Sequence, residues 1–358
     1  MIDSNHDIQI IKTENSRIAQ VDFSQLSFGE IFSDHMYQVE YRDHEWQQPE
    51  IHPFGDITIS PSTSILHYGQ AVFEGLKAFR YKDGKINIFR ARDHFNRFNR
   101  SCKRVSIPEI SEELFIDGLY ALVDLDRDWV PKEKYKSLYI RPFVFATDKF
   151  LGVRASRTYK FMILTGPVGN YYKNGLKPVS LTTMPDFVRA VKGGVGNAKV
   201  PGNYAASIYP AELAKEQGYT QILWLDACEK KFIEEVGTMN IFFMIDDVLI
   251  TPALSGSILE GITRKTVLEV AIGMGYTTEE RAISIDEVIS ASKKGTLQEA
   301  FGTGTAAVIS PVGFIHHEEK EIVINNREIG PVVKKIYNHI TGLHHGDVAD
   351  TNNWCHVF

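Results

Sequence analysis

The sequence is poor in cysteine. Only three occur among 358 residues, Cys102, Cys228 and Cys355, and no two of them form a CxxC pair. This spacing provides neither a disulfide framework nor a cysteine-based zinc site, so it favours a reducing environment. Residues 1–7 lack a signal-peptide pattern, and no apolar run reaches the roughly 20 residues that a membrane helix needs. We therefore expect a cytoplasmic protein without a membrane partner.

An excess of positive charge is absent as well. The formal net charge of -6 at pH 7 gives no basic field for binding nucleic acid. Two pairs of adjacent histidines, at 316–317 and 344–345, have no carboxylate or thiol at a metal-binding spacing. Adjacent side chains of a strand also point to opposite faces. We expect these histidines at the surface and predict no metal site.

The composition that remains is that of an ordinary globular protein, with 43% hydrophobic and 23% charged residues. A chain of this length favours two domains. Glycine and proline are dense in residues 166–180, which we predict to be an interdomain loop. This loop would separate a small N-terminal α/β domain, residues 1–165, from a larger C-terminal α/β domain, residues 181–358. The predicted fold class is mixed α/β.

Local patterns predict the elements of these domains. Asp83-Gly84 predicts a hairpin between strands at 76–81 and 85–89, and apolar residues three or four apart predict a helix that carries Arg97. Ser284 and Glu287 form a capping box at the start of another helix. Further strands are expected at 28–41, 137–146, 159–165, 221–226, 240–245 and 248–251, further helices from 111 and at 204–217, 261–273 and 330–343, and a glycine-rich turn leading into a strand within 301–312.

The most distinctive stretch is KGGVGNAKVPGNY, residues 192–204. Its glycines permit sharp bends or the close approach of a ligand. Lys199 lies between Ala198 and Val200, and an amine in such surroundings can lose its water and act as a nucleophile. A nucleotide P-loop would need glycine directly before the lysine and serine or threonine directly after it, so that interpretation fails. For this stretch alone, a solvated surface loop stays open as the alternative.

Other residues could complete a site for pyridoxal phosphate, which needs a lysine for its aldehyde, an acid beside its ring nitrogen and donors for its phosphate. Glu235 could supply the acid. Gly261-Ile262-Thr263 begins a helix whose amides favour an anion, Thr303-Gly304-Thr305 adds hydroxyls, and Arg97 could add a bidentate charge. Each has an ordinary alternative: a solvated acid, a plain helix start, a β-turn, a surface arginine. Their occurrence together in one chain favours the cofactor site.

Five segments occur in a familiar order: SILHYGQAVFEGLKAFR at 64–80, YIRP at 139–142, the stretch at 192–204, EVGTMN at 235–240 and FGTGTA at 301–306. Together they closely resemble the branched-chain amino-acid aminotransferases, which are fold-type IV pyridoxal-phosphate enzymes. The resemblance runs from about Phe28 to the final helix. It implies the fold-type IV fold, with the active site between two domains and pyridoxal 5′-phosphate as the cofactor.

The resemblance also implies roles for individual residues. Lys199 would bond covalently to the cofactor aldehyde, Glu235 would meet the pyridine nitrogen, and Tyr204 would hydrogen-bond the phenolic oxygen. The residues expected to hold the phosphate are Arg97, Ile262, Thr263 and Thr305, and those expected to support the ring through water are Thr238 and Gln221.

The same resemblance implies a substrate pocket. Its aromatic wall would consist of Phe28, Tyr68, Tyr139 and Tyr171. Thr305 and Ala306 would meet the α-carboxylate through backbone donors, and Arg141 would reach the distal carboxylate of glutamate. The implied assembly is a homodimer in which the segment 151–153, including Val153, reaches the partner's pocket.

The implied activity is a ping-pong transamination of L-leucine, L-isoleucine or L-valine with 2-oxoglutarate. A D-amino-acid aminotransferase and an aminodeoxychorismate lyase of the same fold type are the alternatives, and a non-catalytic phosphate-ligand binding protein is a third. The sequence departs from some animal members, which carry a redox CxxC after the Gly-Thr-Ala turn; here the line continues Ala306-Ala307-Val308. Thiol regulation through that pair is therefore not expected.

Overall fold

A computed structural model describes residues 8–169 and 176–358 of the chain. The chain divides into two compact units, which are described one at a time. The first unit contains Met1–Tyr171, Ala198–Pro201 and Leu343–Phe358, and the second contains Tyr172–Asn197 and Gly202–Gly342. Both combine helices with a sheet, so the predicted mixed α/β class is confirmed.

The described part of the first unit is built on a ten-stranded sheet in the order β1-β4-β2-β9-β8-β6-β7-β19, with β3 beside β2 and β5 beside β8. Its strands are β1 (Gln9–Ile10), β2 (His35–Arg42), β3 (Glu45–Trp46), β4 (Glu50–Pro53), β5 (Ala71–Phe73), β6 (Leu76–Arg80), β7 (Ile86–Phe89), β8 (Ser137–Ala146), β9 (Tyr159–Val168) and β19 (Cys355–Val357). The predicted hairpin at Asp83-Gly84 joins β6 to β7, and Gly84 has the left-handed backbone (φ +90°) that its turn requires.

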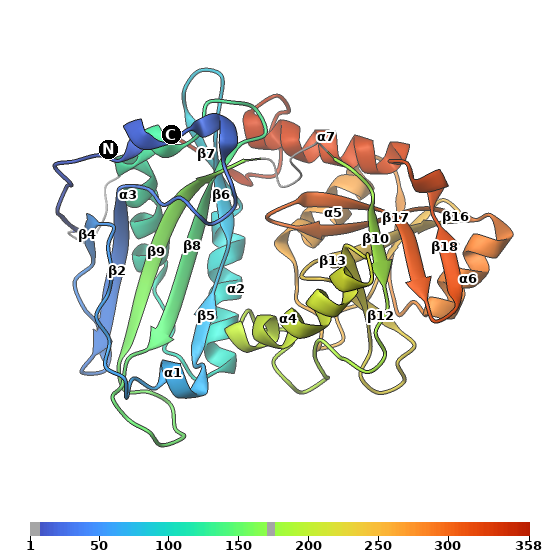
Figure 1. The fold of residues 1–358 in the computed structure, drawn as a ribbon. Coiled ribbons are helices and arrows are strands. Elements are labelled where there is room, and N and C mark those ends of the chain that lie inside the picture. The colour runs from blue at the N-terminus through green and yellow to red at the C-terminus, as the bar shows by residue number, and fades with distance from the viewer. Residues whose placement is uncertain (1–7, 170–175) are drawn as a thin grey trace. The chain divides into compact units, whose positions relative to one another are not determined.

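Two helices, α2 (Ala91–Arg104) and α3 (Gly118–Leu125), lie against this sheet (Figure 1). Phe98 of α2, Phe115 before α3 and Phe161 of β9 form an aromatic cluster with ring centroids 5.3 to 5.6 Å apart. Burying these rings fixes α2 against the strands. The remaining helices of the unit are short: η1 (Ile18–Gln20), η2 (Phe23–Gln25), α1 (Ile65–Tyr68), the π-helical turn η3 (Glu113–Asp117) and η4 (Arg127–Trp129).

The described part of the second unit is built on a nine-stranded sheet in the order β12-β11-β10-β17-β16-β13-β14-β15, with β18 beside β17. Parallel pairings, β10 with β11 and with β17 and β14 with β15, are mixed with antiparallel ones. The strands are β10 (Val179–Thr182), β11 (Gln221–Leu225), β12 (Ile233–Val236), β13 (Asn240–Ile245), β14 (Val248–Thr251), β15 (Thr277–Glu280), β16 (Leu297–Gly304), β17 (Val308–His317) and β18 (Lys320–Val323).

The helices further along the chain are α4 (Pro201–Glu216), α5 (Ile262–Gly273), α6 (Ile285–Lys294), η5 (Asn325–Arg327) and α7 (Pro331–His345). The predicted capping box is confirmed, because the Ser284 hydroxyl accepts the Glu287 N–H at 3.1 Å. Glu299 accepts the N–H groups of Val332 and Val333, both at 2.9 Å, and so caps α7. Within the two described ranges, no helix has the length and apolar composition needed to cross a bilayer.

The strand predicted at 28–41 begins only at His35. Gly29 turns the chain with a φ of +79°, which breaks an extended run. Asp34 instead fixes the N-terminal segment, accepting the Ser16 hydroxyl at 2.6 Å and the Arg17 N–H at 2.9 Å. The prediction failed because alternating aromatic and β-branched residues do not show where a strand stops pairing.

Two further predictions differ from the structure. The glycine-rich residues 301–304 are the end of strand β16, and the turn is formed by 305–307. The helix predicted from Tyr204 begins at Pro201, because proline is well suited to the first helical position, where no N–H bond is needed.

The expectation of surface histidines was wrong for three of the four. His317, His344 and His345 are buried, and His344 stacks on Phe79 with ring centroids 4.2 Å apart. Burial lowers the pKa of His344 well below its usual value, so its ring stays neutral and behaves as an aromatic packing group.

Candidate active site

Lys199 lies at the tip of a three-residue turn in which Val200 N–H donates to Ala198 C=O at 3.1 Å. The turn belongs to the first unit, and both backbone groups of Lys199 are bonded there. Its N–H donates to the Ser101 hydroxyl on α2 at 3.0 Å, and its C=O accepts the Phe73 N–H at 3.1 Å. The amine lies 4.8 Å from the centroid of the Phe73 ring. The turn is therefore docked on the unit, and the solvated-loop alternative does not hold.

Arg97 extends from the same helix as Ser101, four residues earlier, so the two lie on one face. The arginine is buried and meets Glu74 edge-on, with Nε 2.7 Å from Oε1 and Nη2 2.9 Å from Oε2. His94 Nδ1 lies 2.7 Å from Glu74 Oε2. The alternative of a surface arginine is therefore wrong.

The charges of this cluster are well defined. Burial raises the pKa of Glu74, but the Arg97 charge and the hydrogen bonds from Arg97 and His94 outweigh it and hold the pKa below the usual range. Burial lowers the pKa of His94, so a neutral ring donates from Nδ1 to the carboxylate near pH 7. A guanidinium fixed along one edge keeps a fixed direction for its other donors, which is what binding an anion requires.

Aromatic rings and one cation form a second surface of the first unit. Phe28 meets the Tyr139 ring edge-on at 4.8 Å, and Arg141 donates to the Tyr139 hydroxyl at 3.0 Å. The Arg141 guanidinium also lies 4.9 Å from the Phe73 ring centroid. A side chain at Gly75 would collide with the Tyr139 hydroxyl, so glycine leaves the room that this tyrosine occupies. Apolar surface beside a cation can accept either an aliphatic side chain or a carboxylate.

In the second unit, Glu235 is buried on β12 and its two oxygens have different partners. Oε1 accepts the Leu259 N–H at 2.7 Å, and Oε2 lies 3.2 Å from Arg189 Nε. Arg189 also donates to the carbonyls of Gly196 and Ser257. A Cβ at residue 196 would collide with the Ser257 carbonyl, so this glycine of the lysine-containing stretch permits a close approach of two backbone segments.

The neighbouring acid, Glu234, has a different environment. Burial raises its pKa, and the Ser257 hydroxyl donates to its Oε1. The two acids therefore differ in their contacts: Glu234 accepts from a serine hydroxyl, whereas Glu235 accepts a backbone N–H and pairs with Arg189.

Two segments expected to bind phosphate meet at Asn240, the first residue of β13. Its side chain donates to the Leu259 carbonyl at 2.9 Å and packs against Gly261, directly before α5. Its partner in the neighbouring strand is Thr303. The first amides of a helix have no partner within the helix, so the start of α5 can hold an anion. Ile262 and Thr263 occupy that start, and Thr305 and Ala306 lie in the turn that follows β16.

The other predicted residues are placed as follows. Tyr204 is half-buried in the first turns of α4, Gln221 begins β11 with its side chain against Gly237, and Thr238 is exposed in the turn after β12.

Tyr68, at the end of α1, is 43% exposed and donates to the Leu151 carbonyl at 2.5 Å. Val153 is 87% exposed. Tyr171 lies outside the described residues.

Sequence reasoning missed Glu74, His94, Ser101, Phe73 and Arg189. A signal existed for two of them, since His94 and Ser101 lie three residues before and four residues after Arg97 and so share its helix face. Glu74, Phe73 and Arg189 act across sequence separations that no local pattern reveals.

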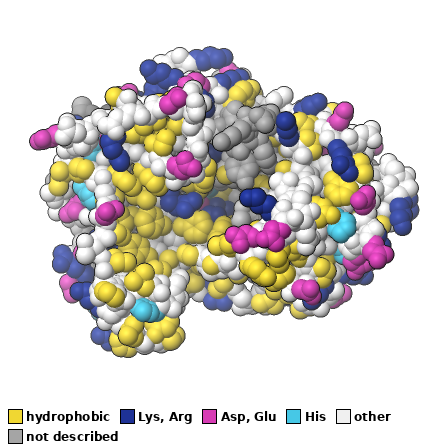
Figure 2. Space-filling view, in the orientation of Figure 1, with side chains coloured by type: hydrophobic (Ala, Val, Ile, Leu, Met, Phe, Trp, Pro, Cys, Tyr) yellow, Lys and Arg dark blue, Asp and Glu magenta, His cyan; other side chains and the backbone are white. Residues whose placement is uncertain are grey.

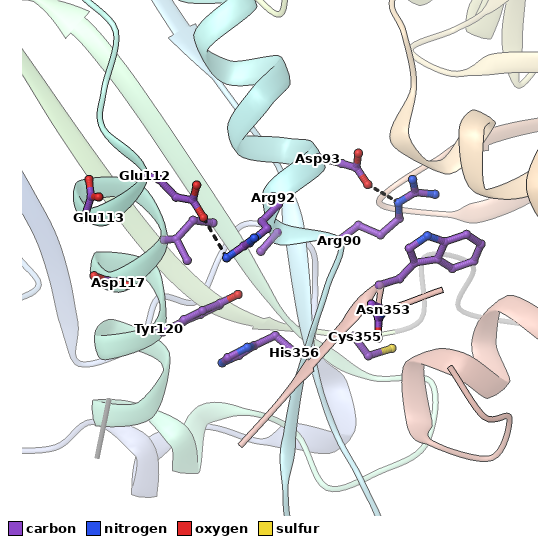
Figure 3. Close-up of a pocket in the computed structure, with 13 residues that line it drawn as sticks. Arg90, Arg92, Asp93, Glu112, Glu113, Asp117, Tyr120, Asn353, Cys355 and His356 are labelled. Carbon is purple, nitrogen blue, oxygen red and sulfur yellow. Dashed lines mark hydrogen bonds and ion pairs between the residues drawn. The ribbon is translucent and has the colours of Figure 1, made fainter. Parts of the chain in front are cut away.

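A cavity of about 630 Å³ in the first unit contains none of the predicted residues. It lies between the start of α2, the segment around η3 and the C-terminal strand (Figure 3). Arg92 pairs with Glu112 at 3.1 Å, and Tyr120 stacks on His356 with centroids 3.8 Å apart. This cavity is therefore separate from the Lys199 turn.

Comparison with known proteins gives a consistent result. Residues 71–315 match the family model described as amino-transferase class IV. The chain is 50% identical over 349 residues to branched-chain-amino-acid aminotransferase 2 of Bacillus subtilis, covering 97% of this chain and 96% of the relative. It is 51% identical over 335 residues to a probable branched-chain-amino-acid aminotransferase of Staphylococcus aureus, covering 93% of each.

Solved structures agree. The crystal structure of the Escherichia coli branched-chain amino acid aminotransferase matches with a TM-score of 0.73 and 26% identity, covering 88% of this chain and 98% of that one. The T.th. branched-chain amino acid aminotransferase complexed with N-(5′-phosphopyridoxyl)-L-glutamate matches with a TM-score of 0.71 and 26% identity, covering 89% and 97%.

Proposed function

The chain belongs to the branched-chain-amino-acid aminotransferases of the class IV aminotransferase family, and from this membership we propose that it exchanges the amino group of L-leucine, L-isoleucine or L-valine with 2-oxoglutarate. The cofactor is pyridoxal 5′-phosphate, which serves as the electron sink for cleavage of the substrate Cα–H bond. The observation that carries the proposal is the docked turn of Lys199, an amine held over an aromatic ring by a helix that also presents Arg97.

The residues present fit this cofactor. Lys199 offers the amine for the aldehyde, and the buried Glu235 offers an acid for the ring nitrogen. Arg97 and the first amides of α5 offer donors for a phosphate. Tyr204 would meet the phenolic oxygen, and Thr238 and Gln221 would support the ring through water. Thr305 completes the phosphate site.

Lys199 is also the group that moves the proton. With the cofactor and substrate bound, its Nζ would take the proton from the substrate Cα and return a proton on the product side, acting as general base and general acid. Glu235 would place its carboxylate beside the ring nitrogen of the bound cofactor. Its Leu259 N–H and Arg189 contacts hold the carboxylate in one orientation, so no reorganisation is needed during the reaction.

Two substrates share one pocket. Phe28, Tyr139 and the other aromatic residues accept a branched side chain by burial, worth roughly 1.5–3 kcal/mol. Arg141 accepts the distal carboxylate of 2-oxoglutarate. Its Nε is buried and makes no hydrogen bond within the described residues, so a carboxylate would satisfy a donor that the aliphatic substrate leaves unpaired. Thr305 and Ala306 offer backbone donors to the α-carboxylate of either substrate.

The active assembly is a homodimer in the cytoplasm. Hydrophobic side chains gather at the surface over α1 and the loop between β8 and β9 (Figure 2). In this loop Leu151 is 62% and Val153 is 87% exposed. Such apolar exposure is typical of an interface, and the segment 151–153 would contribute to the partner's substrate pocket.

The proposal is tested with the purified chain and pyridoxal 5′-phosphate. L-leucine and 2-oxoglutarate should yield glutamate, and borohydride reduction followed by peptide mapping should find the cofactor on Lys199. Lys199→Ala should lose both results, whereas Lys192→Ala, an exposed lysine of the same stretch, should keep both. Cofactor found on another residue, or turnover by Lys199→Ala, would refute the assignment.

The same assay separates the alternatives. A D-amino-acid aminotransferase would prefer D-alanine as donor, and an aminodeoxychorismate lyase would release pyruvate from aminodeoxychorismate. A phosphate-ligand binding protein would show no change in its visible spectrum, whichever amino donor is added.

A further inference from the structure

The hydroxyl of Ser101 joins two parts of the candidate site. Ser101 is 1% exposed on α2, on the face that carries Arg97. Its Oγ donates to the Arg97 carbonyl at 3.0 Å and accepts the Lys199 N–H at 3.0 Å. A hydroxyl has one proton and two lone pairs, so it makes both bonds at once.

The two bonds differ in what they contribute. A serine hydroxyl that donates to the carbonyl four residues back is common in helices and adds little stability, because that carbonyl already accepts a helical N–H. The bond from Lys199 connects segments 98 residues apart in the sequence. A buried N–H needs an acceptor, so this bond fixes where the turn of Lys199 lies along α2.

The position matters because of what else α2 carries. Glu74 holds the Arg97 guanidinium along one edge, one helical turn from Ser101. The N–H of Phe73, the residue before Glu74, donates to the Lys199 carbonyl at 3.1 Å. The lysine and the arginine are thus anchored to the same helix and to adjacent residues of one strand end.

We propose that Ser101 is a positioning residue, which sets the distance between the Lys199 amine and the Arg97 guanidinium to that between the aldehyde and the phosphate of the cofactor. This inference rests on the proposed function. The aldehyde and the methylene arm of the phosphate are attached to adjacent atoms of one rigid ring, so a displaced lysine would leave phosphate binding intact while placing the amine badly for the aldehyde.

Two probes distinguish these steps. Pyridoxal 5′-phosphate is captured when the Lys199 nitrogen forms a C=N bond with the aldehyde carbon and the aldehyde oxygen leaves as water, which changes the visible absorbance. Pyridoxamine 5′-phosphate has the same ring and phosphate but no aldehyde, so its dissociation constant reports non-covalent binding alone. Both measurements use the full chain freed of cofactor.

For Ser101→Ala we expect covalent capture to slow about tenfold, the effect of one lost hydrogen bond, with the pyridoxamine phosphate dissociation constant within about twofold of wild type. Ser101→Thr keeps the hydroxyl and should restore capture. The matched control is Thr341→Val, since Thr341 on α7 is also buried and also donates to the carbonyl four residues back, that of Tyr337, at 2.8 Å. It should change neither probe.

Equal weakening of both probes in Ser101→Ala, or unchanged capture, would overturn the positioning role and leave the proposed function standing. Failure of the wild-type chain to capture pyridoxal phosphate at Lys199 would refute the proposed function and this inference together. Circular dichroism checks that each variant is folded, and if Ser101→Ala does not fold, Ser101→Cys, whose thiol is a poor acceptor, replaces it with the same expected result.

Discussion

Replacing Glu74 by glutamine should destabilise α2 strongly. Glu74 is completely buried and accepts four hydrogen bonds, two from Arg97, one from His94 and one from the Gly75 N–H. A glutamine has nearly the same shape but removes the negative charge that pairs with the buried Arg97. Breaking a buried ion pair by removing one partner costs about 3–5 kcal/mol. We expect a loss of that size in the free energy of opening α2.

Hydrogen exchange of the α2 amides measures this free energy locally, without requiring the whole chain to unfold in one step. The control is Glu40→Gln, because Glu40 pairs with Lys160 at 3.2 Å but is 51% exposed, and exposed pairs contribute less than about 1 kcal/mol. If Glu74→Gln changed α2 exchange by no more than Glu40→Gln does, the buried cluster would not be what holds Arg97.

The pH dependence follows from the direction of the pKa shift. Despite its burial, Glu74 has a pKa below the usual range in the folded state because of Arg97 and His94. Its stabilisation is therefore fully present above the unfolded-state pKa of about 4.3 and is lost as the pH falls below that value. The difference between wild type and Glu74→Gln should shrink in the same range, and a constant difference down to low pH would contradict this account.

Two further predictions address the pocket and the sheet. Arg141→Met should reduce kcat/KM for 2-oxoglutarate about 10- to 100-fold, because a charge-assisted hydrogen bond is lost. It should reduce kcat/KM for L-leucine only a few fold. Equal losses for the two substrates in steady-state kinetics would refute the assignment of Arg141 to the distal carboxylate. The second prediction concerns Lys77 on β6, whose pKa burial lowers to about 8. Keeping its amine charged therefore destabilises the folded wild type below pH 8, and this loss of stability disappears as the pH rises toward 10.5. Lys77→Met should therefore be more stable by up to about 3 kcal/mol at pH 7 and no more stable above pH 10.5, as measured by urea unfolding at both pH values.

The local elements could be predicted because each depends on neighbours in the sequence. The hairpin at Asp83-Gly84 and the cap at Ser284 follow from turn and capping chemistry within four residues. The limits of a strand depend on what pairs with it. Strand β2 begins only at His35, after the turn at Gly29. The residue before it, Asp34, accepts hydrogen bonds from Ser16 and Arg17, a contact across 17 or 18 residues that alternation along the strand cannot show.

The candidate site shows the same division. Lys199 and Arg97 could be predicted because a glycine-rich stretch and a helical pattern surround them. The groups that fix them could not, since Ser101 lies 98 residues from Lys199 and Glu74 lies 23 residues from Arg97. The packing of α2 on the sheet decides which acceptor each buried donor bonds. The periodicity that predicts the helix does not predict these partners.

One geometric rule links these observations. Residues three and four apart on a helix share a face, so His94, Arg97 and Ser101 are brought to one side by the helix itself. The aromatic cluster of Phe98, Phe115 and Phe161 then fixes how α2 is rotated against the sheet. A change that rotated α2 would disturb the Glu74 bonds and the Lys199 bond together, whereas a change at Ser101 alone would disturb only the second. The separate effects expected for Glu74→Gln and Ser101→Ala follow from this arrangement.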